Sequence, residues 1–190
     1  MRVGVLAVQG DFAAHCRALT ELGAEAPEVR DPEALGGLDG LVVPGGESTT
    51  IAKGMERDGL DTAVRRRFDE GMPVFGSCAG MIVCGRDHLG LGDYRCRRNA
   101  FGRQLASFEE DLVIEGLGDD PLRAVYIRAP WAEEVGAGVA VLASHGEHPV
   151  ALRDGNLLAV AFHAELTDDT RLHALFLAMV TSAQEIRSHA

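Results

Sequence analysis

One cysteine carries the clearest chemical signal in this chain of 190 residues. Cys78 stands within the G-x-C-x-G pattern of residues 76–80, directly after a short apolar run. Glycines on both sides permit the tight strand-to-helix turn called a nucleophile elbow, which here carries a thiol. The first amides of the following helix carry partial positive charge, which stabilises a thiolate and the oxyanion that its attack on a carbonyl creates. The pattern predicts acyl transfer with Cys78 as the nucleophile.

A thiol nucleophile needs a base, and the chain has seven histidines. His163 follows the apolar run 157–162 at the end of a predicted strand, where the sites of open α/β sheets gather. Because residues two apart on an extended backbone point the same way, Glu165 can turn the His163 ring toward Cys78. Without the elbow, His163 and Glu165 would more simply be a strand end and a helix start. With it, we predict a triad of Cys78, His163 and Glu165.

The other ionisable side chains of these types are interpreted as structural. Two histidines lie in helical patterns and four in polar or loop-like surroundings, namely His15, His173, His88, His145, His148 and His189. Cys16 and Cys84 are predicted to be packing residues. Cys96 lies among arginines that would favour a reactive thiolate, but packing in a strand is the preferred interpretation.

A second glycine pattern, P-G-G-E-S-T-T at residues 44–50, lies between a predicted strand and a predicted helix. A phosphate cradle is one interpretation, but the G-x-x-x-x-G-K-[ST] and G-x-G-x-x-G patterns are absent. Consecutive glycines also let backbone amides turn toward a reacting carbonyl, on the same sheet edge as Cys78. We therefore predict an oxyanion hole formed by the N–H groups of Gly46 and Ala79.

Composition excludes several classes of protein. The formal net charge of −11 and the pI of about 5.0 lack the basic footprint of a nucleic-acid binder. No apolar run approaches the roughly 20 residues of a membrane span, and the N-terminal run is too short for a signal peptide. Four cysteines without zinc spacing indicate free thiols in a reducing, cytoplasmic setting. We expect a single domain over residues 1–190.

Short apolar runs alternate with helical patterns around these motifs. Strands are predicted at 3–8, 40–44, 73–77 and 157–162, and helices at 12–22, 48–58, 60–70 and from about Thr167 to the end. Alternation of this kind favours a parallel sheet covered on both faces. Residues 93–160 are rich in strand patterns, including 111–114, 124–127 and 139–142. These strands are expected to be antiparallel additions to the core.

Stretches spread over nearly the whole chain resemble the class I, triad-type glutamine amidotransferases, and among them the glutaminase subunits of pyridoxal 5′-phosphate synthases. They are A-V-Q-G at 7–10, P-G-G-E-S-T-T at 44–50, F-G-S-C-A-G at 75–80, R-N-A-F-G-R-Q at 98–104, Y-I-R-A-P at 126–130 and F-H-A-E-L at 162–166. The second and fourth stretches make the resemblance specific. It implies a single-domain α/β fold of three layers, with a flavodoxin-like, mostly parallel sheet and added antiparallel strands.

The resemblance also implies a reaction and its residues. Cys78 would attack the side-chain amide carbon of L-glutamine, His163 would pass the thiol proton to the departing ammonia, and water would hydrolyse the thioester to glutamate. The implied glutamine contacts are Gly46, Glu47, Ser48, Arg98, Ile127 and Arg128. Arginine suits the α-carboxylate of a free amino acid, although Arg98 can also be read as part of a solvated basic edge or partner surface.

In this family the ammonia passes to a separate (β/α)₈-barrel synthase subunit, in a hetero-oligomer that builds pyridoxal phosphate from a pentose phosphate and a triose phosphate. No cofactor and no metal ion is implied. Two departures stand out: Ala164 replaces the usual proline of His-Pro-Glu, and the segment 87–92 is short. The remaining alternatives are a cysteine hydrolase or deglycase-like protein on a related flavodoxin-type fold, and a non-catalytic binding or regulatory module.

Overall fold

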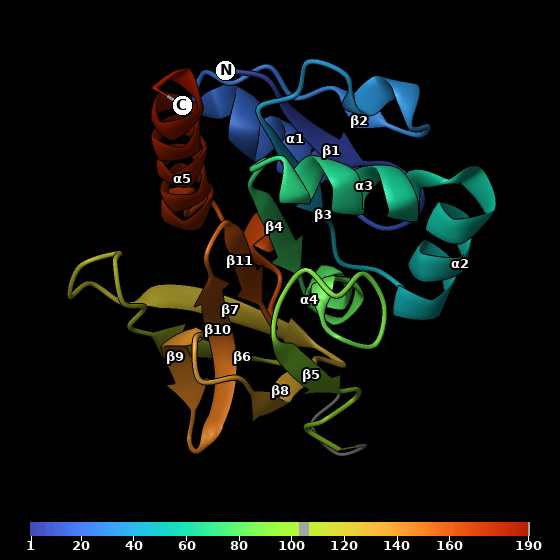
Figure 1. The fold of residues 1–190 in the computed structure, drawn as a ribbon. Coiled ribbons are helices and arrows are strands. Elements are labelled where there is room, and N and C mark those ends of the chain that lie inside the picture. The colour runs from blue at the N-terminus through green and yellow to red at the C-terminus, as the bar shows by residue number, and fades with distance from the viewer. Residues whose placement is uncertain (103–106, 190) are drawn as a thin grey trace.

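Five parallel strands form the centre of the molecule. In the computed structural model, which describes residues 1–102 and 107–189, a seven-stranded sheet has the order β2-β1-β3-β4-β11-β10-β9. The parallel strands are β1 (Val3–Leu6), β2 (Glu28–Val29), β3 (Gly40–Val43), β4 (Val74–Ser77) and β11 (Leu157–Val160). Because they run the same way, the loops that follow β1, β3, β4 and β11 emerge at one edge of the sheet (Figure 1).

Helices cover both faces of this sheet. One group consists of α1 (Phe12–Glu21) and α5 (Arg171–Ser188), which contact each other, and the other of α2 (Ser48–Asp58), α3 (Leu60–Asp69) and α4 (Ala79–Cys84) (Figure 1). Among the helices in the described part of the chain, none is long and apolar enough to cross a membrane. The arrangement confirms the predicted three-layer α/β fold with a mostly parallel sheet.

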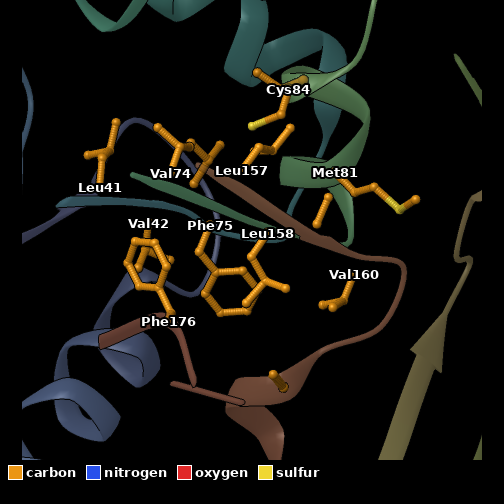
Figure 2. Close-up of a cluster of buried hydrophobic side chains, with 14 of the residues drawn as sticks. Leu41, Val42, Val74, Phe75, Met81, Cys84, Leu157, Leu158, Val160 and Phe176 are labelled. Atoms are coloured by element: carbon orange, nitrogen blue, oxygen red, sulfur yellow. The ribbon is translucent and has the colours of Figure 1, made fainter. Parts of the chain in front are cut away.

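The central strands are apolar on both sides because helices cover both sides. Figure 2 shows neighbouring residues of a strand on opposite faces: Leu41, Val74 and Leu157 lie on the side of Cys84, and Val42, Phe75 and Leu158 on the side of Phe176. All of these side chains are fully buried. The same alternation places Gly76 on the face of β4 that α4 covers, and Ser77 on the same face as Phe75.

The remaining strands are antiparallel, as predicted. Strands β10 (His148–Asp154) and β9 (Ala140–His145) extend the main sheet beside β11. The other four form two separate pairs, which are β5 (Tyr94–Arg97) with β8 (Trp131–Val135) and β6 (Ser107–Leu112) with β7 (Leu122–Ile127). The second pair brings Val125 to within hydrogen-bond distance of the segment after β11, since its carbonyl accepts the His163 N–H at 2.9 Å.

Two predicted boundaries were wrong for reasons that the structure shows. Strand β6 ends at Leu112 instead of continuing to residue 114, since Val113 is exposed and Glu115 N–H instead donates to the Leu142 carbonyl. The last helix begins at Arg171 and not near Thr167. Asp169 explains the delay, because its carboxylate accepts both the Arg171 backbone N–H and the Arg171 guanidinium, and so caps the helix start from outside. A short 3₁₀ helix, Ala164–Leu166, precedes it.

Candidate active site

Cys78 occupies a strained turn between β4 and α4. Its backbone has φ 49° and ψ −104°, a conformation that side-chain-bearing residues rarely adopt. A Cβ atom on Gly76 would lie 2.7 Å from the Gly80 carbonyl, and one on Gly80 would collide with the Val43 carbonyl. The Cys78 N–H donates to the Val160 carbonyl at 2.8 Å, which ties the turn to strand β11. Both glycines are therefore needed for α4 to pack closely enough to present this thiol.

His163 and Glu165 meet as predicted, but the backbone that joins them differs from the prediction. His163 Nδ1 and Glu165 Oε1 are 2.6 Å apart. The extended backbone ends at His163, and Glu165 lies in the 3₁₀ helix Ala164–Leu166. This 3₁₀ turn, and not an extended backbone as predicted, brings the Glu165 carboxylate next to the His163 ring. It forms with Ala164 at the position where the resemblance leads us to expect proline.

The pKa values of this pair favour its charged form. Burial lowers the pKa of His163, but contact with Cys78 and with the Glu165 carboxylate outweighs burial and raises the pKa to about 10. Burial raises the pKa of Glu165, but contacts with His15 and His163 reverse this and hold the pKa well below its usual range. A protonated His163 stabilises negative charge on the neighbouring sulfur. The geometry thus suits a thiolate nucleophile with a proton donor beside it.

Residues 44–47 form one wall of the site. The Cα of Gly45 packs against His163 and Cys78, since a Cβ there would lie 2.5 Å from His163 Cε1 and 3.3 Å from Cys78 Cβ. The Gly45 carbonyl oxygen abuts the Cα of Gly10, so the N–H of the same peptide, on Gly46, points away from Gly10. Gln9 ties this loop to β1, because its Oε1 accepts the Glu47 N–H at 2.6 Å.

Glu47 caps helix α2. Its carboxylate accepts the N–H groups of Thr49 and Thr50 and the Thr50 hydroxyl at 2.7 to 3.0 Å. These bonds, the Thr50 hydroxyl first, lower the pKa of Glu47 to about 2. Arg98 also joins this group by donating to Glu47 and to the Thr49 hydroxyl, each at 3.0 Å. Helix α2 therefore begins with a fixed negative charge and a fixed arginine at the rim of the site.

A cavity of about 490 Å³ lies over Cys78 and His163. It is lined by all the predicted substrate and oxyanion residues, Gly46, Glu47, Ser48, Ala79, Arg98, Ile127 and Arg128, and by four residues that were not predicted as site residues, Gln9, Ile82, Asn99 and Pro130. Gln9, Asn99 and Pro130 could have been found, because each lies within a stretch that carries the family resemblance. Arg103 and Gln104, the end of one such stretch, lie outside the described residues.

Two residues in this cavity have unusual features. Arg128 has φ 46°, the left-handed conformation that favours glycine, at the point where strand β7 has just ended. Ser48 is 2% exposed, and its Oγ has no hydrogen-bond partner among the described residues. Backbone strain and unsatisfied polar groups of this kind are features of ligand sites. In residues 1–102 and 107–189 no group of three or more His, Cys, Asp or Glu side chains is arranged to hold a metal ion.

The three other cysteines are less suited to nucleophilic chemistry. Burial raises the pKa of Cys84 strongly and that of Cys96 to about 12. Cys16 is half-buried, and its pKa is also raised by burial. Cys84 packs in the core and Cys96 lies in strand β5, as expected for both. All four cysteines are unpaired.

Two histidines that were predicted to lie in helices do so, His15 in α1 and His173 in α5, but they are buried close to Glu165. His15 Nε2 lies 3.2 Å from Glu165 Oε2, and His15 Nδ1 lies 2.9 Å from His173 Nε2. Ser77 Oγ lies 3.1 Å from the same Glu165 oxygen. No local pattern marks His15 or His173, because the contact depends on how α1 and α5 pack against each other. The Glu165 carboxylate therefore belongs to a larger polar cluster than the predicted triad.

Comparison with known proteins places this geometry in a family. The model of the SNO glutamine amidotransferase family matches residues 5–182. A curated relative from Mycolicibacterium vanbaalenii, named pyridoxal 5′-phosphate synthase subunit PdxT, is 53% identical over 95% of this chain and 98% of its own length. A relative of the same name from Streptomyces avermitilis is 52% identical over 94% of this chain and 93% of its own length.

Solved structures agree. A crystal structure described as a glutamine amidotransferase superposes with a TM-score of 0.88 at 49% identity, covering 94% of this chain and 98% of that one. A putative GMP synthase subunit from Thermoplasma acidophilum, at 19% identity over 99% of this chain and 98% of that one, has a TM-score of 0.77 and shares the fold. These matches do not favour the deglycase-like or non-catalytic alternatives. The chain belongs to the SNO glutamine amidotransferase family.

Proposed function

We propose that this protein hydrolyses L-glutamine to L-glutamate and ammonia through a thioester on Cys78. The observation that carries the proposal is that Cys78 and His163 both lie against Gly45 in one cavity that two arginines line, with His163 Nδ1 2.6 Å from the Glu165 carboxylate. Cys78 sulfur attacks the side-chain amide carbon, the oxyanion accepts N–H bonds from Gly46 and Ala79, and His163 protonates the departing ammonia. Water, deprotonated by His163, then hydrolyses the thioester and returns the thiol.

The cavity suits the amino-acid end of glutamine. Arg98 and Arg128 provide positive charge for the α-carboxylate, while the ionised Glu47 provides a counter-charge for the α-ammonium group. The unpartnered Ser48 hydroxyl adds a donor or acceptor, and Ile127 supplies an apolar contact for the side-chain methylenes. These roles distinguish glutamine from a simple amide, which has none of the charged groups.

We further propose that the whole chain acts as one glutaminase domain, and that the ammonia is delivered to a pyridoxal 5′-phosphate synthase subunit of (β/α)₈-barrel fold in a hetero-oligomer. The names of the curated relatives support this partner. A cytoplasmic location is supported by the four unpaired cysteines, since a reducing compartment keeps thiols free.

The proposed reaction is tested by measuring glutamate released from glutamine by the chain mixed with a saturating synthase subunit. We expect release by the natural sequence and loss of at least about 10³-fold in Cys78→Ala, because this variant lacks the proposed nucleophile. Cys84→Ala serves as the control, since it removes a buried thiol of high pKa and should leave the rate nearly unchanged. Equal rates for Cys78→Ala and the natural sequence would contradict the proposal.

A further inference from the structure

A buried chain of polar groups continues from Glu165 away from the cavity. The carboxylate has two oxygens with different neighbours: Oε1 is hydrogen-bonded to His163 Nδ1 at 2.6 Å, and Oε2 lies 3.2 Å from His15 Nε2, an ion-pair distance without the alignment of a hydrogen bond. His15 in turn lies 2.9 Å from His173. Both of these histidines are fully buried, His15 on α1 and His173 on α5, and each ring packs edge-on to Phe75 of β4. Groups from three elements thus converge behind one carboxylate.

The partners determine where the protons lie. A carboxylate only accepts hydrogen bonds, so the nitrogen that faces it, His15 Nε2, carries the proton. In neutral His15 the other nitrogen, Nδ1, is then an acceptor, and His173 Nε2–H donates to it. His173 Nδ1 is left without a proton and without a partner in the described part of the chain, which costs less than burying an unpaired N–H. All the donors therefore point one way, toward Glu165.

Other groups around Glu165 fit this arrangement. The titratable groups that face it are His163 after β11 and His15 on α1, and Ser77 of β4 is a further polar neighbour whose hydroxyl lies 3.1 Å from both Oε2 and the Phe162 carbonyl. The pKa of His173 is lowered to about 4, first by burial and then by the proximity of His15, so His173 stays neutral near neutral pH. A neutral His173 is what the donor direction requires.

We propose that His15, oriented by His173, is a positioning residue that keeps Glu165 ionised and turned toward His163. The proposal rests on the function proposed above, because Glu165 matters only if His163 serves Cys78. It goes beyond the triad by assigning a role to two side chains that never reach the cavity. Burial disfavours the ionised form of a carboxylate that has a single polar partner. A second polar group beside Glu165 offsets this penalty. Rotation of Glu165 away from His163 would break the close contact with His15 at the same time.

The experiment compares His15→Leu with His15→Gln in the complex with the synthase subunit, measuring kcat and KM for glutamine across the pH range in which each variant stays folded. Leucine removes the donor at similar volume, whereas the glutamine amide nitrogen can replace His15 Nε2. In His15→Leu we expect kcat to fall about 10- to 100-fold through loss of one close polar contact to a charged group, with KM nearly unchanged. The acidic limb of the kcat profile should move to higher pH, because the pKa of Glu165 rises, and His15→Gln should restore both.

Phe176→Leu is the matched control, because Phe176 is equally buried and packs against the same Phe75 but has no polar atom that could pair with Glu165. A merely structural role for His15 predicts that His15→Leu and Phe176→Leu lose similar activity at every pH and that His15→Gln rescues nothing. That result would overturn the proposal. If His15→Leu does not fold, His173→Leu takes its place, with the same shift of the acidic limb expected at smaller size.

Alkylation of Cys78 by iodoacetamide, followed by peptide mass spectrometry, needs neither glutamine nor synthase. It therefore separates failure of this inference from failure of the proposed function. We expect alkylation of Cys78 below neutral pH to slow about tenfold in His15→Leu, since a poorly oriented His163 stabilises the thiolate less, and to recover in His15→Gln. Unchanged alkylation in His15→Leu would overturn the inference even if the natural sequence hydrolyses glutamine.

Discussion

At the scale of single residues, the protonation of His163 decides how Cys78 can act. The contacts that raise its pKa to about 10 are the sulfur on one side and the Glu165 carboxylate on the other. An imidazolium held in this way is ready to protonate the leaving ammonia. Glu165 supplies the opposite charge in a buried setting, where an unpaired ion would be costly.

Substitution of Arg128 tests how the site recognises the α-carboxylate of glutamine. Arg128→Gln should raise KM for glutamine about 10- to 100-fold through loss of a charge-assisted hydrogen bond, with a smaller effect on kcat. Arg97→Gln is the matched control, because Arg97 is exposed, lies near Glu133 and does not line the cavity. Steady-state kinetics with glutamine measure both variants. Equal KM values for Arg128→Gln and Arg97→Gln would show that Arg128 does not bind substrate.

Glu165 also makes the stability of the fold depend on pH. Its pKa is lower in the folded chain than its ordinary value of 4.5, so its contribution is present above about pH 4.5 and is lost as the pH falls through the folded value. Glu165→Gln should lower the free energy of unfolding by about 3 kcal/mol at neutral pH. In urea titrations this difference should shrink steadily below about pH 4.5.

Glu110→Gln is the comparison for that measurement. Glu110 also pairs with a histidine, His145, at 2.8 Å, but both side chains are about one-third exposed. A pair this exposed to solvent contributes at most about 1 kcal/mol. If both substitutions changed stability by the same small amount at every pH, burial of the Glu165 charge would not have the effect argued here.

At the scale of elements, the site depends on how closely α4 approaches the sheet. Gly80→Ala would place a methyl group against the Val43 carbonyl, and backbone atoms cannot move aside as a flexible side chain can. We expect a loss of about 1 to 3 kcal/mol in unfolding free energy, together with lower glutaminase activity as the elbow shifts. Gly138→Ala is the control, because a Cβ there meets no atom within 4 Å. Similar urea midpoints for the two variants would contradict this account of the elbow.

Local patterns were sufficient to predict the elements that carry the site. The strands before Cys78 and His163 are continuous apolar runs because helices cover both their faces, and glycine marks each sharp turn, so the parallel core could be read from the sequence. The start of α5 was misplaced because residues 167–170 are all polar and carry no apolar period that would mark the first turn, and the helix begins only after Asp169, whose carboxylate accepts the Arg171 N–H. The Asp169 carboxylate, and not the apolar pattern, therefore marks where the helix begins.

The part of the site that the sequence did not reveal depends on tertiary packing. His15 and His173 were interpreted as ordinary helix residues, and their spacing carries no signal for a shared site. They meet only because α1 and α5 lie side by side on the Phe75 face of the sheet. The contact of Glu165 with His163 was predicted, although a 3₁₀ turn and not an extended strand positions Glu165.

At the scale of the whole molecule, a partner can control the site through residues 44–47. Glycines at 45 and 46 let their shared peptide rotate at little steric cost, which would turn the Gly46 N–H away from the oxyanion. A synthase subunit that binds the N–H-inward state more tightly would raise the glutaminase rate, by at most the 100- to 1,000-fold or so that one such donor contributes. Glutamine and the synthase should then strengthen each other's binding.

The comparison needs the rate of glutamate release from the chain alone and with saturating synthase. We expect a higher rate in the complex, mainly through kcat, because the donor acts on the transition state. Equal rates would exclude this control by the partner while leaving the triad intact.

The central claim, that Cys78 attacks the side-chain carbonyl of glutamine, is tested most directly by covalent labelling. A glutamine analogue that carries an electrophile in place of the side-chain amide is incubated with the chain and the synthase subunit, and the modified residue is located by peptide mass spectrometry. The account predicts one label, on Cys78, which excess glutamine prevents and which His163→Ala slows. Labelling of Cys84 or Cys96, or labelling of Cys78 that glutamine does not slow, would contradict it.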